Sequence, residues 1–300
     1  MKKPKINRKI IVVLGPTASG KSDLAVKLAK KFDGEVISAD SRQVYRGMDI
    51  GTGKVTKKEM RNIPHYLLDV SSPKKRFTVT EYRELAEKAL NKIFTKKKIP
   101  IICGGTGFYI QSLIDGTIIP EVIPDWELRK KLEKKSVKEL YDILKELDPK
   151  RARNIDKNNP RRLIRAIEIV RKTKKPIPVL KGKPLPYPVL LIGVKKEPDE
   201  LKKLIRKRLL RRLKSGMVSE IKKLRKSGIS WKRLEEFGLE YRYIALYLQK
   251  KISYKEMVEL LQKKIRHFSK RQMTWFKRDK RIHWIKNYIE TEKLIKPFLN

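Results

Sequence analysis

Cysteine and histidine are scarce in this sequence, whose 300 residues include one cysteine and three histidines. Cys103 has no second cysteine with which to form a disulfide, as is usual for proteins of a reducing compartment. The three histidines, His65, His267 and His283, have no metal-ligand spacing with one another or with Cys103. The composition therefore gives no sign of a disulfide scaffold or of a histidine–cysteine metal site.

Long apolar runs are also absent. The apolar run at residues 10–14 ends at a glycine-containing loop and is too short for the core of a signal peptide. No stretch approaches the ~20 apolar residues that a membrane-spanning helix requires. We therefore expect a soluble, cytoplasmic protein with no membrane partner.

Acidic residues are outnumbered, with 33 of them against 76 lysines and arginines, and the formal net charge is +43. A lysine-rich surface could account for this excess by itself. A polyanionic partner is the sharper interpretation, because phosphate neutralisation dominates nucleic-acid affinity. The basic residues concentrate at 151–171 and at 201–215. Apolar residues make up 40% of the chain, which is enough to bury a core.

Hydrophobic periodicity predicts an α/β core. Short apolar runs alternate with helical patterns, and this strand–crossover–strand order implies a parallel sheet covered by helices. The predicted strands are residues 10–14, 35–39, 66–70, 99–103 and 189–194, and the predicted helices between them are residues 21–32, 80–96 and about 109–113.

Residues 121–187 break this rhythm. Within them, residues 121–175 show helical periodicity and many charges and contain no strand candidate, and five prolines between 176 and 188 follow as a stiff connector. We predict that residues 121–187 form an all-helical insertion domain. The catalytic α/β core would then comprise residues 1–120 and 188–300, with a helical region from 199 to about 279.

The segment 15–22 matches the pattern G-x-x-x-x-G-K-[ST] between the first predicted strand and helix. In that context backbone N–H groups converge on phosphate oxygens, a lysine supplies positive charge, and a serine hydroxyl binds Mg²⁺. The loop therefore predicts a ligand with a diphosphate or longer phosphate chain, with Ser22 as the Mg²⁺ ligand. The predicted diphosphate-binding residues are Gly15, Pro16, Thr17, Ala18, Ser19, Gly20, Lys21 and Ser22.

Two aspartates follow predicted strands, at the sheet edge where ligands of open parallel sheets bind. Either Asp40 or Asp69 could hold the magnesium of a kinase-like site, and Asp69 could equally be an ordinary turn residue. Asp40 begins a polar segment, residues 40–46, so we favour Asp40 for chemistry.

Two arginines, Arg208 and Arg212, share a helical sector with the apolar residues of 201–213. An arginine that faces a core needs a partner, because an unpaired buried charge is costly. A bound diphosphate would satisfy Arg208. The alternative is an arginine that snorkels from the edge of the apolar stripe, which is favoured for Arg212.

Together these blocks resemble the tRNA dimethylallyltransferase family, also called isopentenyl-tRNA transferases, from the loop to Trp284. The resemblance implies a P-loop NTPase-like sheet with an all-helical insertion. A chain of this length without a zinc-binding extension resembles the short bacterial form, and we expect a monomer. The matching blocks are residues 15–22, 40–52, 64–69, 104–109, 148–149, 161–166 and 271–276.

The resemblance implies transfer of the dimethylallyl group from dimethylallyl diphosphate to N6 of the adenine 3′-adjacent to the tRNA anticodon. Asp40 would act as general base for the weakly nucleophilic amine. Loop N–H groups, Lys21, Mg²⁺ and Arg208 would stabilise the departing diphosphate. Thr106 resembles the family's threonine near the reacting base, and Thr17 one that lines the donor site; either hydroxyl could instead cap backbone.

The resemblance also implies RNA contacts in both the core and the insertion. Tyr45, Phe108 and Tyr109 could line a pocket for the unstacked adenine or could belong to the core. Asn159 and Glu240 stand where the family more often has aspartate and glycine, which affects the nearby RNA contacts. The implied tRNA-binding residues are Asp40, Ser41, Arg42, Gln43, Thr106, Arg129, Arg161, Arg162, Leu163, Ile164, Arg165, Tyr241 and Arg242.

Two other functions are compatible with parts of the sequence. The loop alone would permit a small-molecule P-loop kinase, but the chain length, the insertion and the positive charge argue against one. A non-enzymatic RNA-binding protein with a nucleotide switch would explain the charge and would leave Asp40 and Arg208 without a role.

Overall fold

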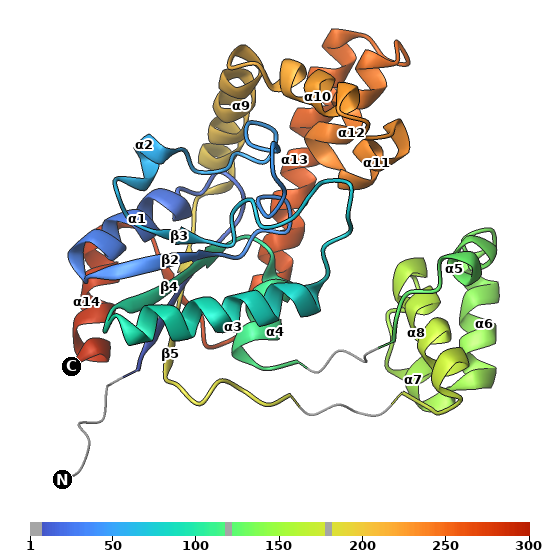
Figure 1. Ribbon diagram of the computed structural model, residues 1–300, viewed down its shortest axis with the longest axis horizontal. Coiled ribbons are helices and arrows are strands. Elements are labelled where there is room, and N and C mark those ends of the chain that lie inside the picture. The colour runs from blue at the N-terminus through green and yellow to red at the C-terminus, as the bar shows by residue number, and fades with distance from the viewer. Residues whose placement is uncertain (1–7, 118–121, 178–181) are drawn as a thin grey trace. The chain divides into compact units, whose positions relative to one another are not determined.

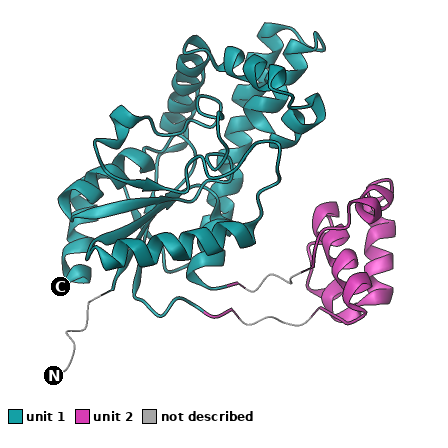
Figure 2. Ribbon diagram, viewed as in Figure 1, with its two compact units in different colours: residues 1–116, 184–300 teal, residues 117–183 magenta. Residues whose placement is uncertain are grey.

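The computed structural model describes residues 8–117, 122–177 and 182–300. Figure 2 shows the two compact units of the chain: unit 1 comprises residues 1–116 and 184–300, and unit 2 comprises residues 117–183. Residues 178–181 of the predicted proline-rich connector lie outside the described residues. Among the described helices, none is both long and apolar enough to cross a membrane.

A six-stranded sheet forms the centre of unit 1. Every pair of neighbouring strands is parallel, in the order β3-β2-β4-β1-β5-β6, which confirms the predicted parallel sheet. The strands are β1 (Ile10–Leu14), β2 (Gly34–Ser38), β3 (His65–Tyr66), β4 (Ile99–Gly104), β5 (Val189–Val194) and β6 (His283–Ile285).

Two strands differ from the prediction by more than one residue at an end. The third, β3, has two residues instead of five, because Leu67 (φ 64°) and Asp69 (φ 58°) adopt left-handed backbone conformations that cannot continue a strand. The sequence does not predict β6, which pairs through three residues with the end of β5. A strand this short carries too little periodicity to be recognised.

Helices cover the sheet, and a helical lobe, residues 198–276, follows β5 (Figure 1). The helices of unit 1 outside the lobe are α1 (Lys21–Lys31), α2 (Lys57–Met60), α3 (Val79–Thr95), α4 (Gly107–Ile114) and α14 (Tyr288–Leu299). The lobe consists of α9 (Pro198–Lys214), α10 (Met217–Lys226), α11 (Trp231–Phe237), α12 (Leu239–Leu248) and α13 (Tyr254–Phe276).

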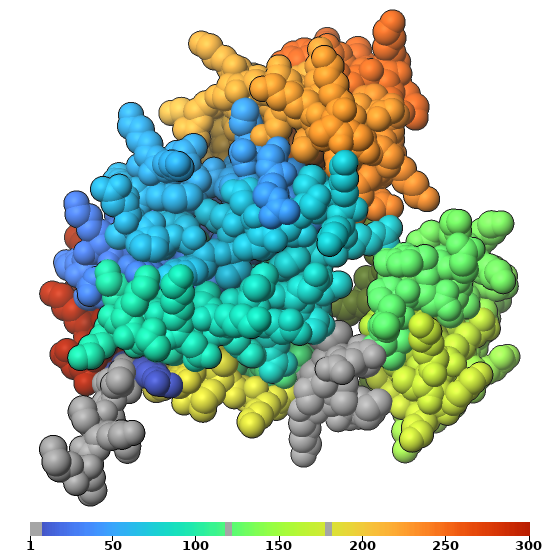
Figure 3. Space-filling view, viewed as in Figure 1, coloured from blue at the N-terminus to red at the C-terminus, as the bar shows by residue number. Residues whose placement is uncertain are grey.

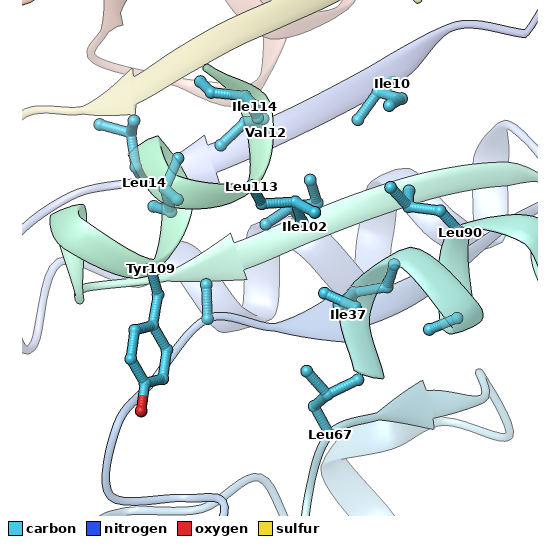
Figure 4. Close-up of a cluster of buried hydrophobic side chains, with 14 of the residues drawn as sticks. Ile10, Val12, Leu14, Ile37, Leu67, Leu90, Ile102, Tyr109, Leu113 and Ile114 are labelled. Atoms are coloured by element: carbon cyan, nitrogen blue, oxygen red, sulfur yellow. The ribbon is translucent and has the colours of Figure 1, made fainter. Parts of the chain in front are cut away.

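Alternate side chains of β1 point to opposite faces of the sheet, and helices cover both faces. Ile10, Val12 and Leu14 belong to an apolar cluster with α3 and α4, part of which Figure 4 shows. Ile11 and Val13 belong to a second cluster with α1 and α14. Because each fully buried large apolar side chain contributes about 1.5–3 kcal/mol, a strand covered on both faces is continuously apolar.

The helical lobe has an apolar core of its own, which includes Leu209, Ile221 and Leu261. Tyr45 and Met48, from the segment after β2, are buried in the same core. Figure 3 shows the corresponding blue and orange segments of the surface against one another. This packing places α9 and α13 beside the carboxyl ends of the strands, where the site lies.

Unit 2 is helical throughout its regular structure and has a separate core. Leucines and isoleucines on three of its helices, among them Leu140, Leu144 and Leu163, are fully buried there. In the described residues 122–177 its helices are α5 (Trp126–Leu132), α6 (Val137–Leu147), α7 (Pro149–Arg153) and α8 (Pro160–Thr173).

Candidate active site

The segment 15–22 forms a tight loop between β1 and α1. Gly15 has φ 155°, and a Cβ atom there would lie 2.9 Å from the carbonyl oxygen of Val194 on the neighbouring strand. Gly20 precedes α1 in the left-handed conformation, with φ 88°. The glycines therefore let the backbone turn sharply enough to aim the N–H groups at the start of α1 towards one point, as anion binding requires.

Polar side chains of the loop have hydrogen-bonding groups that can bind a phosphate chain. The ammonium of Lys21 donates to the carbonyl of Pro16 at 3.2 Å. Burial lowers the pKa of Lys21, and a neighbouring anion would offset this effect. The hydroxyl of Ser19 is buried and has no hydrogen-bond partner among the described residues. Buried polar groups are normally paired, so these atoms suit phosphate oxygens.

Arg208 reaches the loop from α9. Its Nη1 donates to the Thr17 hydroxyl at 3.1 Å, and its Nη2 donates to the Gly53 carbonyl at 3.4 Å. Burial and the nearby charge of Arg212 lower the pKa of Arg208 to about 10, so the guanidinium remains cationic at neutral pH. The Thr17 hydroxyl and the Gly53 carbonyl are both uncharged. Because a buried cation is stabilised by an opposite charge, this guanidinium suits an anion bound beside the loop.

Asp40 and Thr106 follow the neighbouring strands β2 and β4. The Asp40 Oδ1 accepts from the N–H groups of Arg42 at 2.8 Å and Gln43 at 3.4 Å, which fixes the carboxylate. The Thr106 hydroxyl accepts from the Ser41 N–H at 3.1 Å, and the Thr106 N–H donates to the Ala39 carbonyl. The two side chains therefore occupy one rim of the sheet. Because Asp40 is partly exposed there, it is accessible to a ligand.

A buried glutamine on α13 joins the phosphate loop to the turn after β4. The Gln272 Oε1 accepts from the Thr17 N–H at 2.8 Å, and its Nε2 donates to the Gly105 carbonyl at 2.8 Å. A Cβ atom on Gly105 would lie 2.4 Å from that nitrogen, so a glycine is needed. Gln272 is in a block that carries the family resemblance, yet sequence reasoning gave it no role. Its place on the buried face of α13, with Ile265 and Phe276, was the available signal.

Replacement of Gln272 by alanine is expected to loosen the phosphate loop. Both hydrogen bonds would be lost and their backbone partners left buried, which costs about 1–3 kcal/mol of unfolding free energy. Urea denaturation and titration with inorganic pyrophosphate measure the loss of stability and of affinity. Thr274→Ala, at an exposed position on the same helix, is the control. Wild-type stability and pyrophosphate affinity in Gln272→Ala would contradict this role.

The structure gives Asp69 and Arg212 defined partners. The Asp69 carboxylate lies 2.6 Å from the buried Lys54 ammonium, so Asp69 is a structural ion-pair partner in this structure. Arg212 does not snorkel: it is buried and donates to the carbonyls of Ile50 and Gly51 and to Glu240. The snorkelling interpretation of Arg212 is therefore wrong.

Aromatic residues near the site divide between core and surface. Tyr45 and Tyr109 are 3% and 5% exposed, so their side chains belong to the core and are not free to line an adenine pocket. Phe108 is 41% exposed at the start of α4, directly after the turn that holds Thr106. Of the three candidates, Phe108 alone is exposed.

The predicted tRNA-binding residues of unit 1 divide between the rim of the site and helix α12 of the lobe. Arg42 donates to the Phe237 carbonyl at 2.9 Å, and Gln43 donates to the Gly53 carbonyl at 3.2 Å. Arg242 is exposed. Tyr241 requires a correction, because its side chain is 2% exposed and its hydroxyl donates to Glu220.

In unit 2, the predicted block 161–165 contains both exposed and buried residues. Arg161 and Arg162 are exposed in the first turn of α8. Leu163 and Ile164 are 0% and 6% exposed in the core, so the prediction that they contact tRNA is wrong for their side chains. Apolar residues on the inner face of an amphipathic helix pack against its neighbours.

Arg129 and Arg165 share one acidic partner. Arg129 Nη2 lies 2.7 Å from the Glu168 carboxylate and Arg165 Nη1 lies 2.5 Å from it, while Glu168 is fully buried. Burial raises the pKa of Glu168, but hydrogen bonds from Arg129 and Arg165 and the Asp125 N–H outweigh it, so the net effect is a lowered pKa. These arginines therefore stabilise unit 2, whatever they contact in addition.

The two departures from the family pattern have structural explanations. The Asn159 side chain caps α8 by accepting from the Arg162 N–H at 3.3 Å, and asparagine caps as well as aspartate. Glu240 is buried and pairs with Arg212 at 2.9 Å. Glu240 therefore acts within the protein.

The fold and the site define a P-loop α/β protein in which a loop suited to a phosphate chain and a partly exposed carboxylate share the carboxyl edge of one parallel sheet. The model of the IPP transferase family matches residues 43–279, and the chain belongs to this family. It is 43% identical to the tRNA dimethylallyltransferase of Acetivibrio thermocellus over 297 residues, which cover 96% of this chain and 95% of the relative. The relative from Syntrophus aciditrophicus, tRNA dimethylallyltransferase 1, is 42% identical, with 93% of each chain covered.

Two solved structures show the same architecture. The tRNA isopentenylpyrophosphate transferase of Bacillus halodurans superposes with a TM-score of 0.74 at 34% identity, with 97% of each chain covered. A eukaryotic dimethylallyltransferase acting on tRNA gives a TM-score of 0.75 at 28% identity, with 89% of this chain and 69% of that chain covered. The predicted P-loop NTPase-like fold and family membership are confirmed.

Proposed function

We propose that this protein transfers the dimethylallyl group of dimethylallyl diphosphate to N6 of the adenine 3′-adjacent to the anticodon in tRNA. The observation that carries the proposal is the position of the Asp40 carboxylate, fixed at the carboxyl edge of the sheet that also holds the phosphate loop. The turn after β4 links the base to the phosphate site, because Gln272 joins Gly105 to the phosphate loop and the Thr106 hydroxyl accepts from the Ser41 N–H beside Asp40.

The reaction follows from these groups. The N6 lone pair of adenine attacks the first carbon of the dimethylallyl group, and the carbon–oxygen bond to diphosphate breaks. Both electrons of that bond leave with the diphosphate, and the N6 proton passes to Asp40. Loop N–H groups, Lys21 and Arg208 stabilise the growing negative charge because they are already oriented towards it. The Thr106 hydroxyl, which accepts from the Ser41 N–H beside Asp40, would lie close to the entering adenine.

The residues present fit Mg²⁺ as a partner of the diphosphate. Ser22 is an exposed serine at the start of α1, and the described residues contain no group of three or more His, Cys, Asp or Glu side chains that could hold a metal ion. Mg²⁺ is commonly bound through few protein ligands together with substrate phosphates and water. Ser22 would hold the ion, which would neutralise charge on the leaving diphosphate.

The anticodon stem-loop of tRNA is the proposed partner of the basic surface. In the core, Ser41, Arg42, Gln43 and Thr106 adjoin Asp40. In unit 2, Arg161 and Arg162 are exposed where α8 begins. The anticodon-loop adenine can be unstacked at a cost of a few kcal/mol, which allows it to reach a carboxylate at the sheet edge.

Replacement of both Arg161 and Arg162 by alanine is expected to weaken tRNA binding without altering donor binding. If each arginine contacts one phosphate, the slope of log affinity against log salt falls by about 2. Filter binding at several salt concentrations measures this slope. Lys130→Ala is the control, because Lys130 already pairs with Glu127. An unchanged slope in the double variant would place the tRNA elsewhere.

One assay separates the proposed function from a P-loop kinase. The protein is mixed with tRNA, Mg²⁺ and either labelled dimethylallyl diphosphate or ATP labelled in its terminal phosphate. We expect prenyl label in RNA and no phosphate transfer from ATP. Transfer of phosphate to a small acceptor, without prenyl label in RNA, would favour the kinase.

We also propose that the enzyme acts as a cytoplasmic monomer. Asp40, Thr106, Arg208 and the phosphate loop come from one chain, so the catalytic groups need no second copy. Sedimentation at working concentration tests this point, and a stable dimer would contradict it.

A further inference from the structure

A short loop, residues 49–53, connects the active site to the helical lobe. Glu220 on α10 binds the N–H groups of this loop. Its Oε2 accepts from Asp49 at 2.9 Å and from Ile50 at 2.6 Å, and its Oε1 accepts from Gly51 at 3.0 Å. The Tyr241 hydroxyl donates to the same carboxylate at 2.8 Å. Four donors therefore converge on one carboxylate, and charge-assisted bonds of this kind are strong.

Arg212 on α9 binds the carbonyl groups of the same loop. Its Nε donates to the Ile50 carbonyl at 2.5 Å, its Nη2 donates to the Gly51 carbonyl, and its Nη1 pairs with Glu240. Arg212 is 8% exposed, so these bonds lie in a region of low dielectric. An anion thus holds the N–H side of the loop and a cation holds its C=O side.

The far end of the 49–53 loop contacts Arg208. It also contacts Gln43, which is bonded to Asp40. The Gly53 carbonyl accepts from Arg208 Nη2 at 3.4 Å and from Gln43 Nε2 at 3.2 Å. The backbone N–H of Gln43 in turn donates to Asp40. A Cβ atom on Gly53 would lie 2.0 Å from Arg208 Nη2, so the guanidinium lies directly against the loop. The position of this loop therefore bears on Arg208 and, through Gln43, on the Asp40 turn.

We propose that Glu220 and Arg212 are positioning residues of the phosphate site. They fix the 49–53 loop, and the loop holds Arg208 against Thr17, where it meets the leaving diphosphate. Both act through Arg208. Of these three residues, only Arg208 would contact the diphosphate. The catalytic role in this inference rests on the proposed function. The binding of diphosphate by Arg208 can be measured without any transfer reaction.

The test is a double-mutant cycle on the affinity for inorganic pyrophosphate, measured by calorimetry with Mg²⁺ present. Glu220→Gln keeps the side-chain shape and replaces one acceptor oxygen with a donor that faces the loop N–H groups. We expect about tenfold weaker pyrophosphate binding, the size expected for disturbing one charged hydrogen bond. In an Arg208→Ala background the same change should weaken binding by less than about twofold, because the two residues act in series.

Matched variants separate positioning from stability. Glu81→Gln is the control. Like Glu220, the Glu81 carboxylate accepts hydrogen bonds from a backbone N–H and a hydroxyl, here both of Thr78 at the start of α3. This variant should leave pyrophosphate affinity unchanged. Gly53→Ala displaces Arg208 from the loop side and should weaken binding as Glu220→Gln does. If Glu220→Gln fails to fold, Tyr241→Phe removes one bond to Glu220 and keeps the aromatic ring. Its expected effect is about two- to threefold, and it should vanish in the Arg208→Ala background.

Two results would overturn the inference. One is a Glu220→Gln protein, or its Tyr241→Phe substitute, with a lower melting temperature and wild-type pyrophosphate affinity. The other is an equal loss of affinity in the presence and absence of the Arg208 side chain. A wild-type protein that binds pyrophosphate and transfers no dimethylallyl group would contradict the proposed function instead, and the cycle would still decide the role of Glu220.

Discussion

Asp40→Asn is expected to lower the rate of dimethylallyl transfer by about 10²- to 10⁴-fold, the usual contribution of a positioned general base. The amide keeps the shape of the carboxylate and one oxygen for the N–H groups of Arg42 and Gln43. It loses the ability to take the N6 proton. Single-turnover transfer to tRNA, with saturating donor and Mg²⁺, measures the chemical step directly.

The affinity for tRNA should be nearly unchanged in Asp40→Asn, and Asp40→Ala should behave similarly. Asp33→Asn is the control. Asp33 is an exposed aspartate that pairs with Lys98 and directly precedes β2, at the end of the strand opposite to Asp40. Wild-type transfer rates in both Asp40 variants would show that Asp40 is not the general base.

Arg208→Ala is expected to reduce kcat/KM for the prenyl donor by about 10²- to 10³-fold, as loss of one preorganised donor to a developing anion commonly does. The guanidinium lies beside the phosphate loop, 3.1 Å from the Thr17 hydroxyl. Part of the loss should appear in kcat, because the charge on the diphosphate grows as the carbon–oxygen bond breaks.

Arg208→Lys should recover only part of this loss, because lysine cannot donate to Thr17 and the diphosphate in the same fork geometry. Arg206→Ala, at an exposed position two residues away on α9, should leave donor kinetics near the wild type. Equal donor kinetics in Arg208→Ala and Arg206→Ala would show that Arg208 does not contact the diphosphate.

The sequence predicted the features that depend on local pattern. Ile10–Leu14 is apolar on both faces and is followed by the phosphate-loop spacing, so its central place in a parallel sheet could be inferred. Asp40 could be selected because it follows a buried strand and begins a polar segment.

Features that depend on distant pairing could not be inferred. Strand β6 is a strand only because its three residues lie beside Ile192–Val194. Arg212 lies on the apolar stripe of α9, but its partners Ile50 and Gly51 are about 160 residues away. Family motifs gave the positions of Leu163, Ile164 and Tyr241 and could not show that these side chains are buried.

The most direct test of the proposed reaction is to locate the transferred group. An anticodon stem-loop RNA is incubated with the protein, Mg²⁺ and labelled dimethylallyl diphosphate, then digested to nucleosides and analysed by mass spectrometry. We expect one dimethylallyl group on N6 of the adenine 3′-adjacent to the anticodon. We also expect no label when a purine without the exocyclic amine replaces that adenine. Equal labelling of this substituted RNA, or a modified phosphate in place of a modified base, would contradict the proposed reaction.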